Sequence, residues 1–182
     1  MTGRRADILA WNRLGHALFA EHVDFDGPRR TAERPNLARL LFLDAHTREL
    51  YADWEAKAKG TVENLRMVAG RYPDDTLLTS LIGELTVRSE EFATMWTGHR
   101  VKPCAAARHE MWHPLVGTLT VTHQTLPLPQ AEDQKLTLAI AEPGSPSQEA
   151  MALLAQSRAA PAAKRTDERR DGPEPRSAQR NG

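Results

Sequence analysis

The sequence predicts an α+β fold, in which several helices pack against an antiparallel sheet. Between residues 37 and 96, apolar side chains recur every three or four positions, which is the pattern of helices with one buried face. In residues 118–123 and 136–141 the period changes to two, and β-branched residues are frequent, which is typical of strands. The two strand segments follow the helical segments, so we expect helices and sheet to form successive parts of one domain.

The composition indicates one domain and disfavours several functions. The chain has 182 residues, with 24 basic and 24 acidic side chains. A dedicated nucleic-acid binder usually carries a basic excess, so this balance argues against that partner. The single cysteine, Cys104, excludes an internal disulfide and fits a reducing compartment. No apolar run approaches the roughly 20 residues of a membrane span, and residues 8–20 lack a signal-peptide core, so we expect a cytoplasmic protein.

The chain divides into three parts. Residues 1–4 are expected to be a flexible start, and residues 5–156 to form the folded domain. Residues 157–182 are rich in proline, alanine and charged side chains and lack aromatic residues. Such a segment cannot bury enough apolar surface to offset the entropy lost on ordering, so we expect a disordered tail.

The first helices are marked by caps and breaks. Residues 5–11 suit either a strand or the start of a helix, and Asn36 lies where a helix cap is expected. A long helix is predicted over residues 47–69, and Gly70 and Pro73 end it. Its apolar stripe consists of Leu50, Trp54, Ala58, Val62, Leu65 and Ala69.

Two further helices and a final one follow from similar signals. Asp74 and Asp75 open a helix, and Ser89 caps another. The predicted buried face of the first comprises Leu77, Leu78, Leu81, Ile82 and Leu85, and that of the second Phe92, Met95, Trp96 and His99. Residues 145–148 form a capping box with a proline at the first helical position, so a last helix begins there. We expect Met151, Leu153 and Leu154 to pack.

The two predicted strands form an antiparallel pair. In the first, Leu119, Val121 and His123 alternate with threonines; in the second, Leu136, Leu138 and Ile140 alternate with smaller residues. Residues 126–134 form the linker between them.

Several segments, in this order, carry a resemblance to a known family. They are residues 7–12 (DILAWN), 36–44 (NLARLLFLD), 51–55 (YADWE), 85–101, in which Ser89, Phe92, Trp96, His99 and Val101 keep a characteristic spacing, His113-Pro114 with Gly117, and 141–147 (AEPGSPS). Over about residues 5–155 the chain resembles the MmyB-like ligand-binding domain of bacterial transcription regulators. No single segment is decisive, but the ordered set is specific.

The resemblance implies a PAS-like fold, in which an antiparallel sheet holds a small molecule against helices. Regulators of this family normally carry an N-terminal helix-turn-helix of the Xre type and are thought to bind a fatty-acid-like or other apolar ligand. Binding then biases how the DNA-binding part sits, and pairing into dimers is plausible. This chain starts almost at the sensor domain, so we expect DNA contact only through a helix-turn-helix that it lacks. Residues 102–108, which lack the expected basic run, and His123, where the family tends to have tyrosine, also depart from the pattern.

The candidate ligand-binding residues are of two kinds. Aromatic side chains are candidate walls of an enclosed, water-poor hollow, and each has plain core packing as its alternative. Polar side chains could hold a carboxylate, and their alternatives are surface exposure or helix capping. The aromatic set is Trp11, Phe19, Phe42, Trp54, Phe92, Trp96 and Trp112; the polar set is Asn12, Asn36, Arg66 and Arg88. Apart from a bound fatty-acid-like molecule, no cofactor is expected.

Two other functions stay open beside the sensor. One is a truncated regulator that acts as an interaction module, pairing with full-length relatives. The other is a zinc hydrolase, because residues 109–113 read His-Glu-Met-Trp-His, a spacing that binds zinc when it lies on a helix. Pro114 biases His113 away from helical geometry, and a strand pattern begins soon after it. We therefore expect a protein that is not an enzyme.

Overall fold

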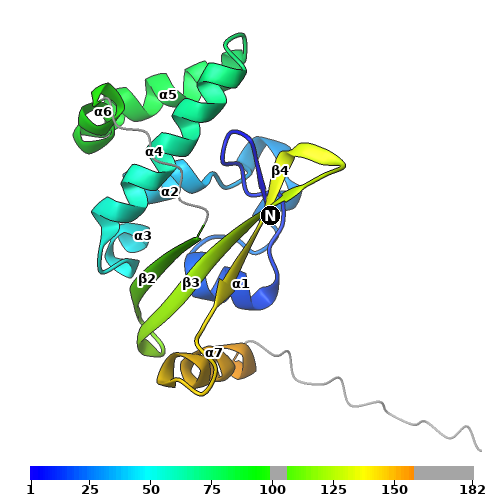
Figure 1. The fold of residues 1–182 in the computed structure, drawn as a ribbon, viewed down its shortest axis with the longest axis vertical. Coiled ribbons are helices and arrows are strands. Elements are labelled where there is room, and N and C mark those ends of the chain that lie inside the picture. The colour runs from blue at the N-terminus through cyan, green and yellow to red at the C-terminus, as the bar shows by residue number, and fades with distance from the viewer. Residues whose placement is uncertain (99–105, 158–182) are drawn as a thin grey trace, which may run out of the picture.

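The computed structural model describes residues 1–98 and 106–157, which form helices around a strongly curled sheet (Figure 1). The α+β class predicted from the sequence is confirmed, while likeness to PAS domains in particular stays a prediction. The elements are β1 (Thr2–Gly3), α1 (Arg13–Ala20), the 3-10 turns η1 (Gly27–Arg29) and η2 (Thr31–Glu33), α2 (Leu37–Leu43), α3 (Ala45–Leu50), α4 (Trp54–Arg71), α5 (Thr76–Arg88), α6 (Glu90–Thr97), β2 (Ala106–His113), β3 (Gly117–Leu128), β4 (Ala131–Ile140) and α7 (Pro146–Ser157).

Most predicted helix starts are confirmed, because side-chain caps fix them. Asp75 accepts a hydrogen bond from the Leu78 amide at 3.0 Å, and Ser89 accepts one from Phe92 at 3.1 Å. Asn36 caps α2 and also donates from its amide to the Arg5 carbonyl at 2.8 Å. Within the described residues no helix is long and apolar enough to cross a membrane.

The prediction of a single helix over residues 47–69 is wrong, because the chain turns at residues 51–53 and forms two helices, α3 and α4. Tyr51 forms a β-bridge with Met111, and the Ala52 amide donates to the Glu110 carbonyl at 3.0 Å. Asp53 then caps the new helix by accepting from the Ala56 amide at 2.9 Å. Contact with a strand sixty residues away therefore overrides the local helical periodicity.

The four strands of the described residues are antiparallel, in the order β1-β4-β3-β2. The predicted pairing of residues 118–123 with 136–141 is confirmed, although both strands extend through most of the expected linker and leave only Pro129 and Gln130 as the turn. Strand β2 was not expected from the sequence; its residues 106–113 pair with residues 117–124.

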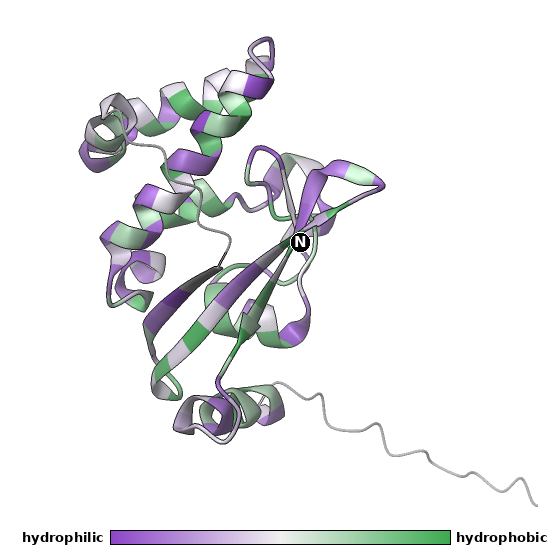
Figure 2. Cartoon of the chain, in the orientation of Figure 1, coloured by the Kyte–Doolittle hydropathy of each residue, from purple (hydrophilic) through white to green (hydrophobic). Residues whose placement is uncertain are grey.

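The sheet has an inner face toward the helices and an outer face toward solvent. On β2 and β3 six inner residues are buried: His109, Met111, His113, Leu119, Val121 and His123. Strand β4 behaves differently, because its large aliphatic residues lie on the outer face and remain 37–45 % exposed: Leu136, Leu138 and Ile140. Figure 2 shows this hydrophobic run along the half of β4 nearer α7.

Helices cover the inner face and one end of the sheet (Figure 1). Helix α1 contacts the sheet through its Ala17 carbonyl, which lies 2.9 Å from His113 Nε2. Helix α7 lies at the end of the sheet, where Ser147 Oγ accepts from the Thr120 amide at 2.9 Å. The prediction that Leu77 and Leu153 are packed in the core is wrong, because Leu77 is 62 % exposed on α5 and Leu153 is 60 % exposed on α7.

The first residues are tied to distant parts of the chain. Residues 1–4 fall outside the domain expected from the sequence, yet Thr2 and Gly3 pair with β4 and the Met1 ammonium donates to the Ala10 carbonyl at 2.7 Å. Arg4 bridges Asp75 at 3.0 Å and Asp133 at 2.8 Å. Predictions that concern residues 99–105 and 158–182, including those for His99 and Cys104, lie outside the described residues.

Candidate functional site

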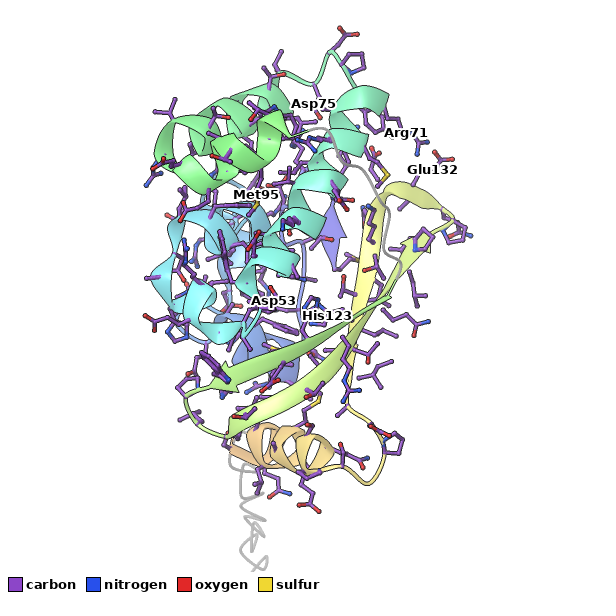
Figure 3. The ribbon with its side chains drawn as sticks, turned by 60° about the vertical axis from the view of Figure 1, so that its left-hand side comes forward. Asp53, Arg71, Asp75, Met95, His123 and Glu132 are labelled. Carbon is purple, nitrogen blue, oxygen red and sulfur yellow. The ribbon has the colours of Figure 1, made fainter. Side chains whose placement is uncertain are left out.

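The inner face of the sheet carries a polar pair that the sequence did not single out. Lys57 projects from the first turn of α4, and its Nζ lies 3.1 Å from Nδ1 of His123 on β3. His123 is 7 % exposed, whereas Lys57 is partly exposed, so the pair runs from the surface into the interior. Figure 3 shows His123 on the side of the sheet that faces α4, below Asp53.

Aromatic side chains from three elements surround this pair. The His123 ring contacts His109 of β2 at 4.6 Å and Phe19 of α1 at 5.1 Å between ring centroids. Tyr51, which precedes α4, contacts His109 edge-on at 5.7 Å and lies 5.5 Å from Lys57 Nζ. The bridge between Tyr51 and Met111 fixes this side of the cluster, so the break between α3 and α4 also builds the site.

Burial changes the ionisation of every group in the cluster. Desolvation disfavours the charged form, and it lowers the pKa of Lys57 to about 8. Burial, together with the charge on Lys57, lowers the pKa of His109 to about 4 and that of His123 to about 2. Burial also raises the pKa of Tyr51. At neutral pH the site therefore holds one ammonium ion beside two neutral imidazoles.

Two polar groups of the cluster lack a partner that their chemistry would favour. Nε2 of His123 is buried and has no hydrogen-bond partner among the described residues. Lys57 has no carboxylate within 4.0 Å in the described part of the chain, unlike Lys59 on the same helix, which pairs with Glu55. A buried polar atom without a partner costs on the order of 1–3 kcal/mol, and such exceptions need an explanation.

The zinc-hydrolase alternative fails on geometry. Residues 109–113 lie in strand β2, so His109 and His113 are four strand residues, or about 13 Å, apart. His113 is held by the Ala17 carbonyl, and Glu110 points to the exposed outer face. Among the described residues there is no group of three or more histidine, cysteine, aspartate or glutamate side chains placed to hold a metal ion.

Two hollows stand out among the described residues, and both are open at the surface. One, of about 320 Å³, lies at the β3–β4 turn beside Tyr72. The other, of about 540 Å³, lies on the outer face of the sheet between Arg108, Ile140 and Pro146. Neither is the enclosed hollow expected from the sequence, because both open to solvent, and that hollow stays a prediction.

Four of the predicted aromatic residues come together, but among the helices and not at the sheet. Phe92 is 0 % exposed, contacts Phe42 edge-on at 5.0 Å and stacks on Trp96 at 5.6 Å. Trp54 contacts Phe42 at 5.6 Å, and its Nε1 donates to the Leu41 carbonyl at 2.8 Å. All four therefore have core contacts, and a ligand role for them stays a prediction.

The predicted polar residues lie far from one another in the fold, and each already forms hydrogen bonds or ion pairs within the protein. Arg66 donates to the Met95 and Trp96 carbonyls at the end of α6 and lies over the Trp96 ring. Arg88 forms an exposed pair with Glu84 at 3.0 Å. Asn12 caps α1 through the Gly15 amide at 2.7 Å. Trp11 donates to the Phe25 carbonyl at 2.8 Å and is not part of the aromatic group.

Two signals in the sequence could have indicated the cluster. Lys57 lies three residues after Trp54 and four before Thr61, at the edge of the apolar stripe of α4. His123 lies two residues from Val121 and His109 two residues from Met111, and both of these neighbours face the core, so strand periodicity places the histidines inside as well. Once β2 is known to be a strand, the two histidines fall on the same face.

Comparisons with known proteins agree with the resemblance in the sequence. The family model described as the MmyB-like transcription regulator ligand binding domain matches residues 1–154. No match is found among curated proteins. The matched range includes the whole sheet, both histidines, Lys57 and most of α7. The chain therefore belongs to the family of MmyB-like transcription regulator ligand-binding domains.

Proposed function

We propose that this domain senses a small fatty-acid-like molecule with an apolar body, and that the molecule binds at the inner face of the sheet next to His123. In a complete regulator, binding would change how an attached helix-turn-helix sits on DNA. The family supports a ligand-sensing role for the domain, and the chemical nature of the ligand is our proposal. The role is one of binding and not of catalysis.

The observation that carries this proposal is the buried, unpartnered Nε2 of His123 within an apolar surrounding. Phe19, Met111 and Val121 lie on the same side of the sheet and supply apolar contact area. A ligand that places a polar end at His123 and an apolar part along these residues would satisfy the atom and bury its own surface. Such a division of polar and apolar parts is that of a fatty-acid-like molecule.

A ligand could reach the inner face of the sheet from the solvent at the residues that follow His123 on β3. Thr125 of β3 follows His123 on the inner face and pairs with Thr137 of β4, and both threonines are exposed. Met111 and Val121, farther in on the same face, are 0 % exposed, so the apolar part of a ligand must displace side chains as it enters. Ligand binding would then separate helices from sheet, which is a movement that an attached domain could detect.

The proposal predicts a chain-length series. Octanoic, decanoic and dodecanoic acid should bind with affinities that rise about fourfold for each added methylene, because each buried methylene contributes about 0.8 kcal/mol. Isothermal titration calorimetry on the full chain measures this directly, with heat-unfolded protein as the control for non-specific uptake. Affinities that do not change with chain length, or no binding at all, would contradict an apolar ligand.

A second candidate function is that of an interaction module, and the outer face of the sheet favours it. Leu126 lies opposite Leu136, and both belong to an apolar stripe on the solvent side of β3 and β4 that continues through Leu138 and Ile140. Soluble monomers seldom expose a contiguous stripe of this kind. In this function a second copy of the chain, or a full-length relative, would pack against the stripe.

This candidate predicts a dimer that one outward charge disrupts. The wild-type chain should sediment as a dimer at micromolar concentration, and Leu138→Glu should sediment as a monomer, because a buried unpaired carboxylate opposes association. Val87→Glu serves as the matched control, since Val87 is 86 % exposed on α5, away from the sheet. A wild-type chain that remains monomeric over this range rules out self-association through the stripe.

A further inference from the structure

The inner face of the sheet contains more positive charge than the protein compensates. Lys57 contacts a neutral histidine, and Lys135 of β4 donates to Asn64 Oδ1 at 2.6 Å. Neither ammonium has a carboxylate within 4.0 Å among the described residues, and burial lowers the pKa of both. Lys57 and Asn64, which bonds Lys135, are seven residues apart on α4, so their backbone positions lie roughly 10 Å apart along one side of the helix.

The hydrogen bond between Lys57 and His123 fixes the role of each atom. The ammonium can only donate, so Nδ1 of His123 must accept and must carry no proton. A neutral imidazole then carries its proton on Nε2, which makes the unpartnered atom a donor. The site therefore presents N–H donors from Lys57 and from His123, with no acceptor from the described residues to receive the second.

The residues around Lys57 and His123 favour an acceptor that carries a negative charge. Of the acidic residues nearest in sequence, Glu55 pairs with Lys59, and Asp53 caps α4 by accepting from the Ala56 amide, although its charge also acts on His109. The remaining neighbours are His109, Tyr51 and Phe19, none of which is negatively charged at neutral pH. In such partly desolvated surroundings a negative charge beside an ammonium gains more than it would in water.

From these contacts we infer that Lys57 and His123 bind the anionic carboxylate of the ligand, with Lys57 as the charge partner and His123 Nε2 as the second donor. The inference rests on the proposed function and adds to it the ionic form of the ligand: an apolar carboxylic acid bound as its anion, and not a neutral alcohol, ester or hydrocarbon. It also replaces Arg66 and Arg88, the donors expected from the sequence, since both are already engaged by protein oxygens.

The test compares decanoic acid with decan-1-ol, which share one chain and differ in the charge at its end. Decan-1-ol partitions more readily into apolar surroundings, so a preference for the acid requires a specific contact. Wild-type protein should bind decanoate at least tenfold more tightly than decan-1-ol at pH 7.5. Lys57→Met, which keeps an apolar stem of similar length, should lose that preference, whereas Lys59→Met, at an exposed position on the same helix, should keep it.

Each outcome decides a different question. Equal binding of acid and alcohol by the wild type, or an undiminished preference in Lys57→Met, overturns the inference and leaves the proposed function standing. Binding of neither compound overturns both. Because the wild-type comparison needs no substitution, a folding defect in a variant cannot obscure the result, and circular dichroism confirms that Lys57→Met and Lys59→Met are equally folded.

Discussion

Phe92→Ala is expected to lower the free energy of unfolding by about 3–5 kcal/mol, the usual cost of removing a fully buried phenylalanine. Phe92 has no exposed surface, and its ring lies between Phe42 and Trp96. Its loss removes both aromatic contacts and leaves a cavity where α2, α4 and α6 meet. Urea denaturation of the wild type and the variant measures the difference, provided that both unfold in a single transition.

Val87→Ala is the control for this substitution. Val87 is 86 % exposed on α5, and replacing it should change stability by no more than about 0.5 kcal/mol. A loss below about 1 kcal/mol in Phe92→Ala would mean that the aromatic group collapses easily around the missing ring. That result would favour the ligand role predicted from the sequence for Phe42, Trp54 and Trp96 over a purely structural one.

Stability should fall steeply between pH 6.5 and pH 4.5 because of the two buried histidines. Their pKa values in the folded protein, about 4 for His109 and about 2 for His123, lie below the ordinary value of 6.5. The unfolded chain therefore takes up protons first as the pH falls. Above pH 6.5 both histidines are neutral in the folded and the unfolded state, so they do not change the free energy of unfolding. Below pH 6.5 each histidine lowers that free energy by up to about 1.4 kcal/mol per pH unit, so the two together give a slope of up to about 2.7 kcal/mol per unit.

Carboxyl groups change the stability only at lower pH, so their contribution can be separated from that of the histidines. Burial opposes ionisation of Asp75, but the Leu78 amide and two arginines outweigh it and lower the pKa of this carboxyl, so its contribution is lost only when the unfolded chain protonates carboxyls near pH 4. His123→Phe should remove about half of the slope between pH 6.5 and 4.5 and keep the contact with Phe19. Urea midpoints at pH 7.0, 6.0 and 5.0 measure the slope, and an unchanged slope in His123→Phe would show that His123 titrates normally.

Local signals predicted the helix boundaries well, because caps act over three or four residues. Asp75, Ser89 and Ser145 are each read correctly from a polar residue followed by an apolar pattern. The break at Tyr51 could not be predicted in this way, since it depends on pairing with Met111. Strand β2 was missed for a related reason: the histidine-rich segment has little β propensity of its own and is a strand because β3 pairs with it.

The candidate site was harder to predict than the fold. Most of the predicted aromatic residues are buried or half-buried, but Trp112 is 58 % exposed on the outer face of β2. Burial alone also does not distinguish a ligand wall from core. The position of Lys57 was only a weak signal, because a lysine beside an apolar stripe is usually solvated, and its contact with His123 joins residues 66 positions apart. The alternation in β4 also gave the wrong impression of which side is buried, since its polar residues Asp133 and Lys135 face inward and bond to Tyr72 and Asn64.

The carboxylate of Asp75 has a consequence for how the whole molecule loses its structure. It is 5 % exposed and joins the first turn of α5 to Arg4 and Arg5, whose neighbours Thr2 and Gly3 extend the sheet. Helices α5 and α6 would otherwise contact mainly other helices and could melt as a separate unit. Because one buried anion links them to the opposite end of the polypeptide, we expect the helical layer and the sheet to denature together, as one cooperative body.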